Sequence, residues 1–152
     1  MYKILKCLET ISQQYQLIFP IHPRTKKSLP AHFITACSNM LFTEPLGYLQ
    51  FLKLQKNAAF VITDSGGIQE ESTYLGVPCF TLRNNTERPV TVQLGTNILV
   101  GTHIENLKNE VNKFLNGERK QASIPPLWDG KAAQRIAGIV NELMMQNDEV
   151  VK

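Results

Sequence analysis

The chain has 152 residues, of which 43% are hydrophobic and 19% charged, and its formal net charge is +3. Length and composition predict one folded domain and exclude an intrinsically disordered chain. The excess of positive charge is small and the 16 basic residues form no dense patch, so we expect no nucleic-acid partner. No apolar run approaches the ~20 residues of a membrane-spanning helix, so we expect no membrane partner either.

The first part of the chain predicts short strands between helices. A helical period predicts an opening amphipathic helix from four apolar residues: Ile4, Leu8, Ile11 and Tyr15. The apolar runs 17–21 and 40–43 predict two strands, with a polar loop or short helix between them. A further helix is predicted to begin near Leu46.

The middle of the chain holds the clearest strand signal. Residues 58–63 end in three β-branched residues and lead into Asp64-Ser65-Gly66-Gly67, where we expect a helix to start. That helix is predicted to end at Gly76, because glycine readily takes the left-handed conformation at a helix C-terminus. The next strand is predicted at 79–82.

The last part predicts a loop-rich segment at 84–95, a strand at 96–100 and a helix over 104–114. Asp129 can cap a final helix. Its apolar spacing predicts a buried stripe made of Ala133, Ile136, Val140 and Leu143.

Short apolar strands that alternate with helices are typical of βαβ units. We therefore expect an α/β fold, a three-layer Rossmann-like parallel sheet, formed by a single domain over residues 1–152.

The three cysteines, Cys7, Cys37 and Cys79, have no paired spacing, which predicts free and mostly buried thiols in a reducing compartment. The charged N-terminal segment has no secretory signal, so we expect a cytoplasmic protein. The histidines have no Cys or acidic partners at metal-ligand spacing, and no cofactor motif is present. We expect no metal and no cofactor.

Ligands of open parallel sheets bind beyond the carboxyl ends of the strands. There, Gly66 and Gly67 would expose backbone amides at a helix N-terminus, which favours an anion such as phosphate, with the Ser65 hydroxyl beside them. Glycine is also required by tight turns and close helix packing, so both interpretations stay open. Glu71 could accept hydrogen bonds from a ribose diol, or simply complement the helix dipole.

Arg88 lies in the loop after the 79–82 strand, where it could bind phosphate oxygens or only pair with Glu87. His22 follows the first strand and could donate to a phosphate or a sugar hydroxyl, or could simply be solvated. No P-loop, dinucleotide, serine-hydrolase or zinc-protease motif is present. The residues themselves thus predict a nucleotide-phosphate or nucleotide-sugar binding domain.

Several motifs together resemble the non-hydrolysing UDP-N-acetylglucosamine 2-epimerases, in the order of that family and over nearly the whole chain. They are His22-Pro23-Arg24-Thr25, Glu44-Pro45-Leu46-Gly47-Tyr48, Asp64-Ser65-Gly66-Gly67-Ile68-Gln69-Glu70-Glu71, Arg83-Asn84-Asn85-Thr86-Glu87-Arg88-Pro89 and Asp129-Gly130-Lys131.

The resemblance implies the C-terminal half of a glycosyltransferase-B architecture, in which two Rossmann-like domains face each other across a cleft. It implies that Ser65, Gly66, Gly67 and Glu71 bind the UDP phosphates and ribose, and that Arg88 meets the diphosphate. His22 and Arg24 would line the nucleotide-sugar side, and the segment 45–51 would lie near the uracil.

The family interconverts UDP-N-acetylglucosamine and its manno epimer by eliminating and re-adding UDP. Its acids and bases lie in the N-terminal domain, so we expect no catalytic residue in this chain, inactivity of the chain alone, and an N-terminal half-domain or homodimer partner. A related glycosyltransferase or hydrolysing epimerase, and a non-enzymatic binding module, are the alternatives.

Overall fold

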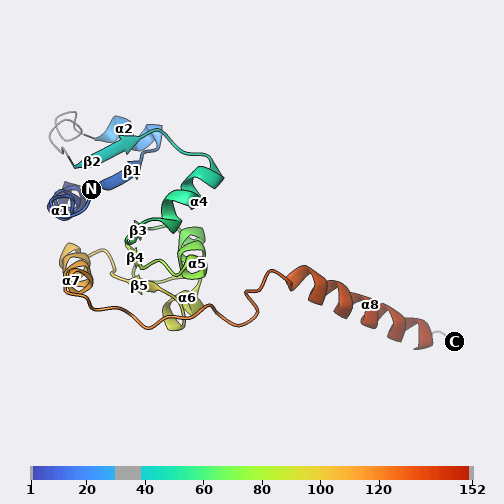
Figure 1. Ribbon diagram of the computed structural model, residues 1–152. Helices are drawn as coiled ribbons and strands as arrows, with labels where there is room; N and C mark the ends of the chain where they lie inside the picture. The colour runs from blue at the N-terminus through green and yellow to red at the C-terminus, as the bar shows by residue number, and fades with distance from the viewer. Residues whose placement is uncertain (1, 30–38, 151–152) are drawn as a thin grey trace.

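The computed structural model describes residues 2–29 and 39–150 of the chain (Figure 1). Cys37 and much of the predicted 22–39 loop lie outside this part. The elements before the glycine turn are α1 (Tyr2–Ser12), β1 (Leu17–Pro20), α2 (Pro23–Ser28), β2 (Met40–Thr43), α4 (Tyr48–Lys56) and β3 (Val61–Thr63). Those that follow are α5 (Gly66–Leu75), β4 (Cys79–Thr81), α6 (Pro89–Gln93), β5 (Asn97–Leu99), α7 (Ile104–Leu115) and α8 (Ala132–Val150).

All the described strands pair in parallel, which confirms the predicted α/β fold. Their hydrogen bonds form two ladders, β1–β2 and β3–β4–β5. In the second ladder Cys79 of β4 is in register with Val61 on one side and with Asn97 on the other. Parallel pairing brings the carboxyl ends of β3, β4 and β5 to one edge, where the predicted site lies.

The three-stranded sheet is the middle of three layers. Helices α1 and α7 cover one face and α5 and α6 lie on the other side (Figure 1). The main core fills the space between the first pair and the sheet, and its buried members are Cys7, Ile11, Phe80, Val100, Leu107, Val111 and Phe114. Leu8 and Leu17 pack against this core and also against the smaller core around β1 and β2, so the two ladders share one hydrophobic interior.

The glycine turn begins a helix and Gly76 ends it, as predicted. Gly76 has φ = 71°, the left-handed conformation, and its amide donates to the end of α5. The segment predicted to be loop-rich contains a short helix, α6, which sequence periodicity missed because it has only five residues. Proline at its first position is a sufficient start signal in hindsight.

The final helix differs from its prediction. Asp129 Oδ1 accepts the Lys131 amide at 3.0 Å, and α8 then leads away from the body of the molecule (Figure 1). The predicted stripe is not buried, since Ile136 is 61% exposed and Leu143 56% exposed. Ala133 and Val140 are exposed too. The apolar spacing is typical of a helix with one buried face, but no surface within the described residues covers that face of α8.

The two described cysteines are buried free thiols, in agreement with the prediction. Burial raises the pKa of both Cys7 and Cys79, so neither is a thiolate nucleophile near neutral pH. No helix in the described ranges is both long and apolar enough to cross a membrane.

Candidate functional site

The turn between β3 and α5 leaves backbone amides without side-chain caps. Thr63 is buried at the end of β3, and its Oγ1 accepts the Ser65 amide at 3.0 Å, which shapes the turn. Ser65 is the N-cap residue of α5, with an extended backbone, but its hydroxyl makes no capping hydrogen bond. The amides of the first helical turn therefore point out of the helix end, where the helix dipole favours an anion.

Gly66 and Gly67 have no structural reason to be glycine. Neither has a positive φ, in contrast to Gly76. A Cβ atom built on either residue would meet nothing within 4 Å, whereas at Gly95 it would lie 2.4 Å from Thr73. The turn and helix packing therefore do not explain the pair. What the two glycines provide is open space directly over the helix N-terminus.

Glu71 lies one helical turn further along α5 and is oriented by α4. Gln55 of α4, which is buried, donates from Nε2 to Glu71 Oε2 at 2.6 Å. Among the described residues no donor reaches the other carboxylate oxygen, Oε1. The carboxylate is thus fixed by one oxygen and retains acceptor capacity on the other, as a site for vicinal hydroxyls requires.

An open groove of about 530 Å³ lies beside Glu71. Tyr48 at the start of α4 and Trp128 in the segment before α8 contribute aromatic rings to its wall. Tyr48 is 63% exposed. A flat ligand could stack on such rings next to the carboxylate.

Arg88 contacts the same helix from the neighbouring loop. Its Nε lies 3.0 Å from Glu70 Oε1, and Nη1 donates to the Glu87 backbone carbonyl at 3.4 Å. Of the two predicted interpretations, pairing with Glu87 is therefore wrong, because the carboxylate that pairs with Arg88 is that of Glu70. Both side chains of the pair are more than a third exposed, so solvent weakens the pair and the guanidinium can exchange partners.

His22 and Arg24 follow β1 at the start of α2. His22 is the N-cap residue, and its Nδ1 accepts the Arg24 amide at 3.2 Å. Both residues are exposed, and the Arg24 guanidinium makes no hydrogen bond or ion pair with a described residue. No hydrogen bond or ion pair between described residues joins this pair to the glycine turn. The structure thus links Ser65, Gly66, Gly67, Glu71 and Arg88 through α5, and leaves His22 and Arg24 apart.

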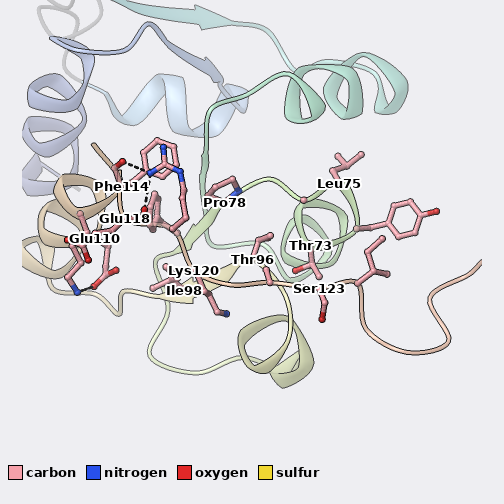
Figure 2. A pocket seen from close by; sticks show the side chains of 17 residues that line it. Thr73, Leu75, Pro78, Thr96, Ile98, Glu110, Phe114, Glu118, Lys120 and Ser123 are labelled. Carbon is pink, nitrogen blue, oxygen red and sulfur yellow. Dashed lines mark hydrogen bonds and ion pairs between the residues drawn. The ribbon is translucent and has the colours of Figure 1, made fainter. Parts of the chain in front are cut away.

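A separate cavity of about 740 Å³ lies at the other edge of the sheet, where β4 and β5 begin (Figure 2). Lys120 lies in its wall, but its ammonium donates to the backbone carbonyls of Val92 and Asn97, the latter at 2.8 Å. Partial burial lowers the pKa of Lys120. The other two cations of the wall are engaged as well, since Lys113 pairs with Glu110 and Arg119 donates to the Phe114 and Glu118 carbonyls. Because all three cations have protein partners, this cavity is a poor anion site.

Two polar residues close to the site were not predicted from the sequence. Gln69 in α5 and Asn97 in β5 are both completely buried. The sequence offers one signal for them: each is a polar residue at a position where the helix or strand pattern predicts a buried side chain. Buried polar side chains need hydrogen-bond partners.

Comparison with known proteins places these features in a family. A family model described as UDP-N-acetylglucosamine 2-epimerase matches residues 1–141. A UDP-N-acetylglucosamine 2-epimerase of Methanococcus maripaludis is 46% identical over 144 residues, which span 91% of this chain and 39% of the relative. One from Methanocaldococcus jannaschii is 50% identical over 128 residues, 82% of this chain and 34% of the relative.

Solved structures agree with the sequence comparison. The Methanocaldococcus jannaschii UDP-GlcNAc 2-epimerase superposes with a TM-score of 0.76 at 44% identity, over 93% of this chain and 40% of that one. A structure of that enzyme in complex with UDP-GlcNAc and UDP has a TM-score of 0.73, over 93% of this chain and 39% of that one. This chain therefore spans about two fifths of the length of such relatives.

Proposed function

The chain belongs to the UDP-N-acetylglucosamine 2-epimerase family, and on that premise we propose that it is a single UDP-binding domain of such an enzyme. In this proposal residues 1–152 hold UDP while UDP-N-acetylglucosamine and its manno epimer interconvert. Two supports are the parallel sheet with its loops at one edge and the epimerase activity of the relatives.

The diphosphate binds at the N-terminus of α5. The observation that carries the proposal is the open space over Gly66 and Gly67, which neither turn geometry nor packing explains. Unpaired amides at a helix end attract a phosphate without a lysine, and the uncapped Ser65 hydroxyl adds a donor. Arg88 exchanges Glu70 for a phosphate oxygen, where a guanidinium can bind through two parallel hydrogen bonds.

The nucleoside extends from the helix N-terminus toward α4. Glu71 Oε1 accepts the ribose hydroxyls while Gln55 holds Oε2 in place. The uracil lies against the 45–51 segment, where the exposed ring of Tyr48 borders the groove. His22 and Arg24 face the sugar from the end of β1.

UDP is the leaving group of the epimerisation, so negative charge grows on the diphosphate as its bond to the sugar breaks. Fixed amides and a guanidinium stabilise that charge without reorganising, which lowers the barrier to elimination. Removal and return of the C2 proton need an acid and a base. Neither is assigned to this chain, and both belong to the rest of the relatives' length.

The exposed stripe of α8 supports a second polypeptide surface as partner. Ile136, Ile139 and Leu143 repeat at helical spacing and are each more than half exposed. Exposing an apolar helix face of this kind to water costs free energy, so burial of the face against another protein surface is favoured. The partner we assign is the N-terminal half-domain that makes up the remaining length of the relatives.

Calorimetric titration of UDP into wild-type protein and the Gly67→Ala variant tests the proposal. The methyl group enters open space, so it clashes with no protein atom. Alanine is favoured over glycine inside a helix by up to about 1 kcal/mol, so the variant should be at least as stable as wild type. UDP affinity should nevertheless fall at least about tenfold, because the methyl group occupies the space of the phosphate.

Gly138→Ala is the matched control. Gly138 is a glycine of α8 with nothing within 4 Å of a built Cβ, and it lies far along the chain from the turn. This variant should gain stability and bind UDP as wild type does. Unchanged UDP affinity in Gly67→Ala, or no binding to the wild-type chain, rejects the proposed diphosphate site.

A further inference from the structure

A buried polar network lies beneath the candidate site and joins three elements. The Gln69 side chain of α5 accepts two hydrogen bonds at Oε1, one from Thr86 Oγ1 at 2.6 Å and one from Asn97 Nδ2 at 3.0 Å. Asn97 opens β5, and its Oδ1 accepts a third hydrogen bond, from Thr81 Oγ1 of β4 at 2.6 Å. The network thus connects α5 to the loop of Arg88 and to the sheet.

Stability alone does not explain these residues. Gln69, Asn97 and Thr81 are 0% exposed, at positions where apolar side chains would pack without desolvation cost. Gln69 Nε2 is buried and has no hydrogen-bond partner among the described residues, so the network is not fully satisfied. A polar network retained despite an unpaired donor points to a role in geometry.

Both backbone polar groups of Arg88 are held by this network. On one side, the Arg88 amide donates to Thr86 Oγ1 at 2.9 Å, and the same hydroxyl donates to Gln69. On the other side, the Arg88 carbonyl accepts Thr91 Oγ1 at 2.7 Å, and Thr91 Oγ1 accepts Asn97 Nδ2 at 3.0 Å.

The backbone of Arg88 is therefore part of a closed ring of hydrogen bonds, and the two sides of the ring meet at Gln69 Oε1. Gln69 is part of α5, the helix whose N-terminus forms the anion site, and the next residue is Glu70, the ion-pair partner of the Arg88 side chain. The ring holds the loop against α5 through hydrogen bonds in the interior. The exposed ion pair holds the same loop against α5 at the surface.

We propose that Gln69, Thr86, Thr91 and Asn97 are positioning residues that hold Arg88 at the distance from the α5 N-terminus at which its guanidinium meets the ligand's diphosphate. This inference rests on the proposed function. The network itself touches no ligand and acts only through Arg88. Without it the guanidinium would still be present but would sample more positions, so the affinity it contributes would be lost.

A double-mutant cycle on UDP affinity, measured by calorimetry, tests the inference. Thr86→Val removes the hydroxyl and keeps the shape, and Thr86→Ser keeps the hydroxyl. Arg88→Ala and Thr86→Val should each weaken UDP binding about tenfold, the loss of one charge-assisted interaction. The double variant should be no weaker than Arg88→Ala alone, and Thr86→Ser should bind within about twofold of wild type.

Thr91→Val tests the carbonyl side of Arg88, because it removes the hydroxyl that joins the Arg88 carbonyl to Asn97, while the Thr91 amide still donates to that carbonyl at 3.0 Å. It should weaken UDP binding in the same direction as Thr86→Val but by less, again with no further loss when combined with Arg88→Ala, and it preserves the test if Thr86→Val fails to fold. Thr10→Val is the matched control, since Thr10 is exposed and its Oγ1 donates to a backbone carbonyl within α1. It should leave UDP affinity unchanged.

The outcomes separate the two proposals. If Arg88→Ala weakens binding but both valine variants bind as wild type does, the positioning role is overturned while the UDP site stands. Losses that add in the double variant overturn it as well, since the residues then act independently of Arg88. If Arg88→Ala has no effect, its assignment to the diphosphate fails and this inference fails with it.

Discussion

At the scale of single residues, Glu71 gives the most specific test of where the nucleoside binds. Its carboxylate is held by Gln55 on one oxygen and has no described donor on the other. Glu71→Gln keeps the size of the side chain but removes the charge. We expect calorimetry to report UDP affinity lower by about tenfold, the loss of a charge-assisted hydrogen bond of ~1.5 kcal/mol.

Inorganic pyrophosphate is the control ligand for that variant, because it carries the diphosphate charge without a ribose. Its affinity should be unchanged or slightly higher in Glu71→Gln, since one negative charge near the anion site is gone. An equal loss for UDP and pyrophosphate would contradict the ribose role and indicate that Glu71 shapes the turn instead.

The structure brings together most of the residues that the sequence predicts for the candidate site, but the sequence does not predict how they are connected. The glycine turn, the carboxylate after it and the arginine of the next loop follow from residue type and strand order. That Arg88 pairs with Glu70 rather than with its neighbour Glu87 depends on how a loop folds back over a helix. Local sequence carries little information on such a contact, and the buried partners of Gln69 are equally long-range.

At the scale of elements, α5 approaches the segment after α6 very closely. Its buried face is made of small or polar residues, Gln69, Ser72 and Thr73, and Gly95 lies against it. A Cβ at Gly95 would lie 2.4 Å from Thr73 side-chain atoms and 2.7 Å from the Thr91 carbonyl. The absence of a side chain at Gly95 is thus required by packing, in contrast to the glycines of the turn.

Gly95→Ala should therefore lower the free energy of unfolding by about 1 to 3 kcal/mol, the usual cost of overpacking. Urea denaturation followed by circular dichroism measures it. Gly67→Ala is the comparison, since the same added methyl group meets no atom there. Equal stability of the two variants would contradict the close approach of α5 and the segment after α6.

The elements were predicted well where periodicity or turn residues mark them. Strands β1 to β5 and helices α5 and α7 lie where apolar runs and glycines predict them. Helix α6 was missed because five residues are too few to show a period. The predicted burial of the α8 stripe was wrong because a hydrophobic pattern predicts that a face is covered, but not that the covering surface belongs to this chain.

At the scale of the whole molecule, the exposed stripe of α8 is the surface proposed to meet the rest of the enzyme. Ile136 and Leu143 lie on the exposed stripe, while Gln134 and Asn141 lie on the opposite side of the helical period. Ile136→Glu with Leu143→Glu should leave UDP affinity and the unfolding free energy nearly unchanged, because exposed substitutions usually shift stability by less than about 0.5 kcal/mol.

The same variant should fail to restore epimerase turnover when mixed with the separately expressed N-terminal remainder of the Methanocaldococcus jannaschii relative, whereas the wild-type chain restores it. Gln134→Glu with Asn141→Glu is the matched control and should behave as wild type. Full activity of the stripe variant would show that α8 does not bind the remainder.

In the proposed diphosphate site, ligand and Glu70 compete for the guanidinium of Arg88. A ligand gains the guanidinium only by displacing a carboxylate that is tethered beside it and so present at high effective concentration. Chloride and other monovalent ions compete poorly with such a tethered carboxylate, whereas a diphosphate, with several negative oxygens and simultaneous contact with the helix amides, competes well. In this proposal Glu70 is a built-in counterion, and it favours multivalent anions over monovalent ones at the guanidinium.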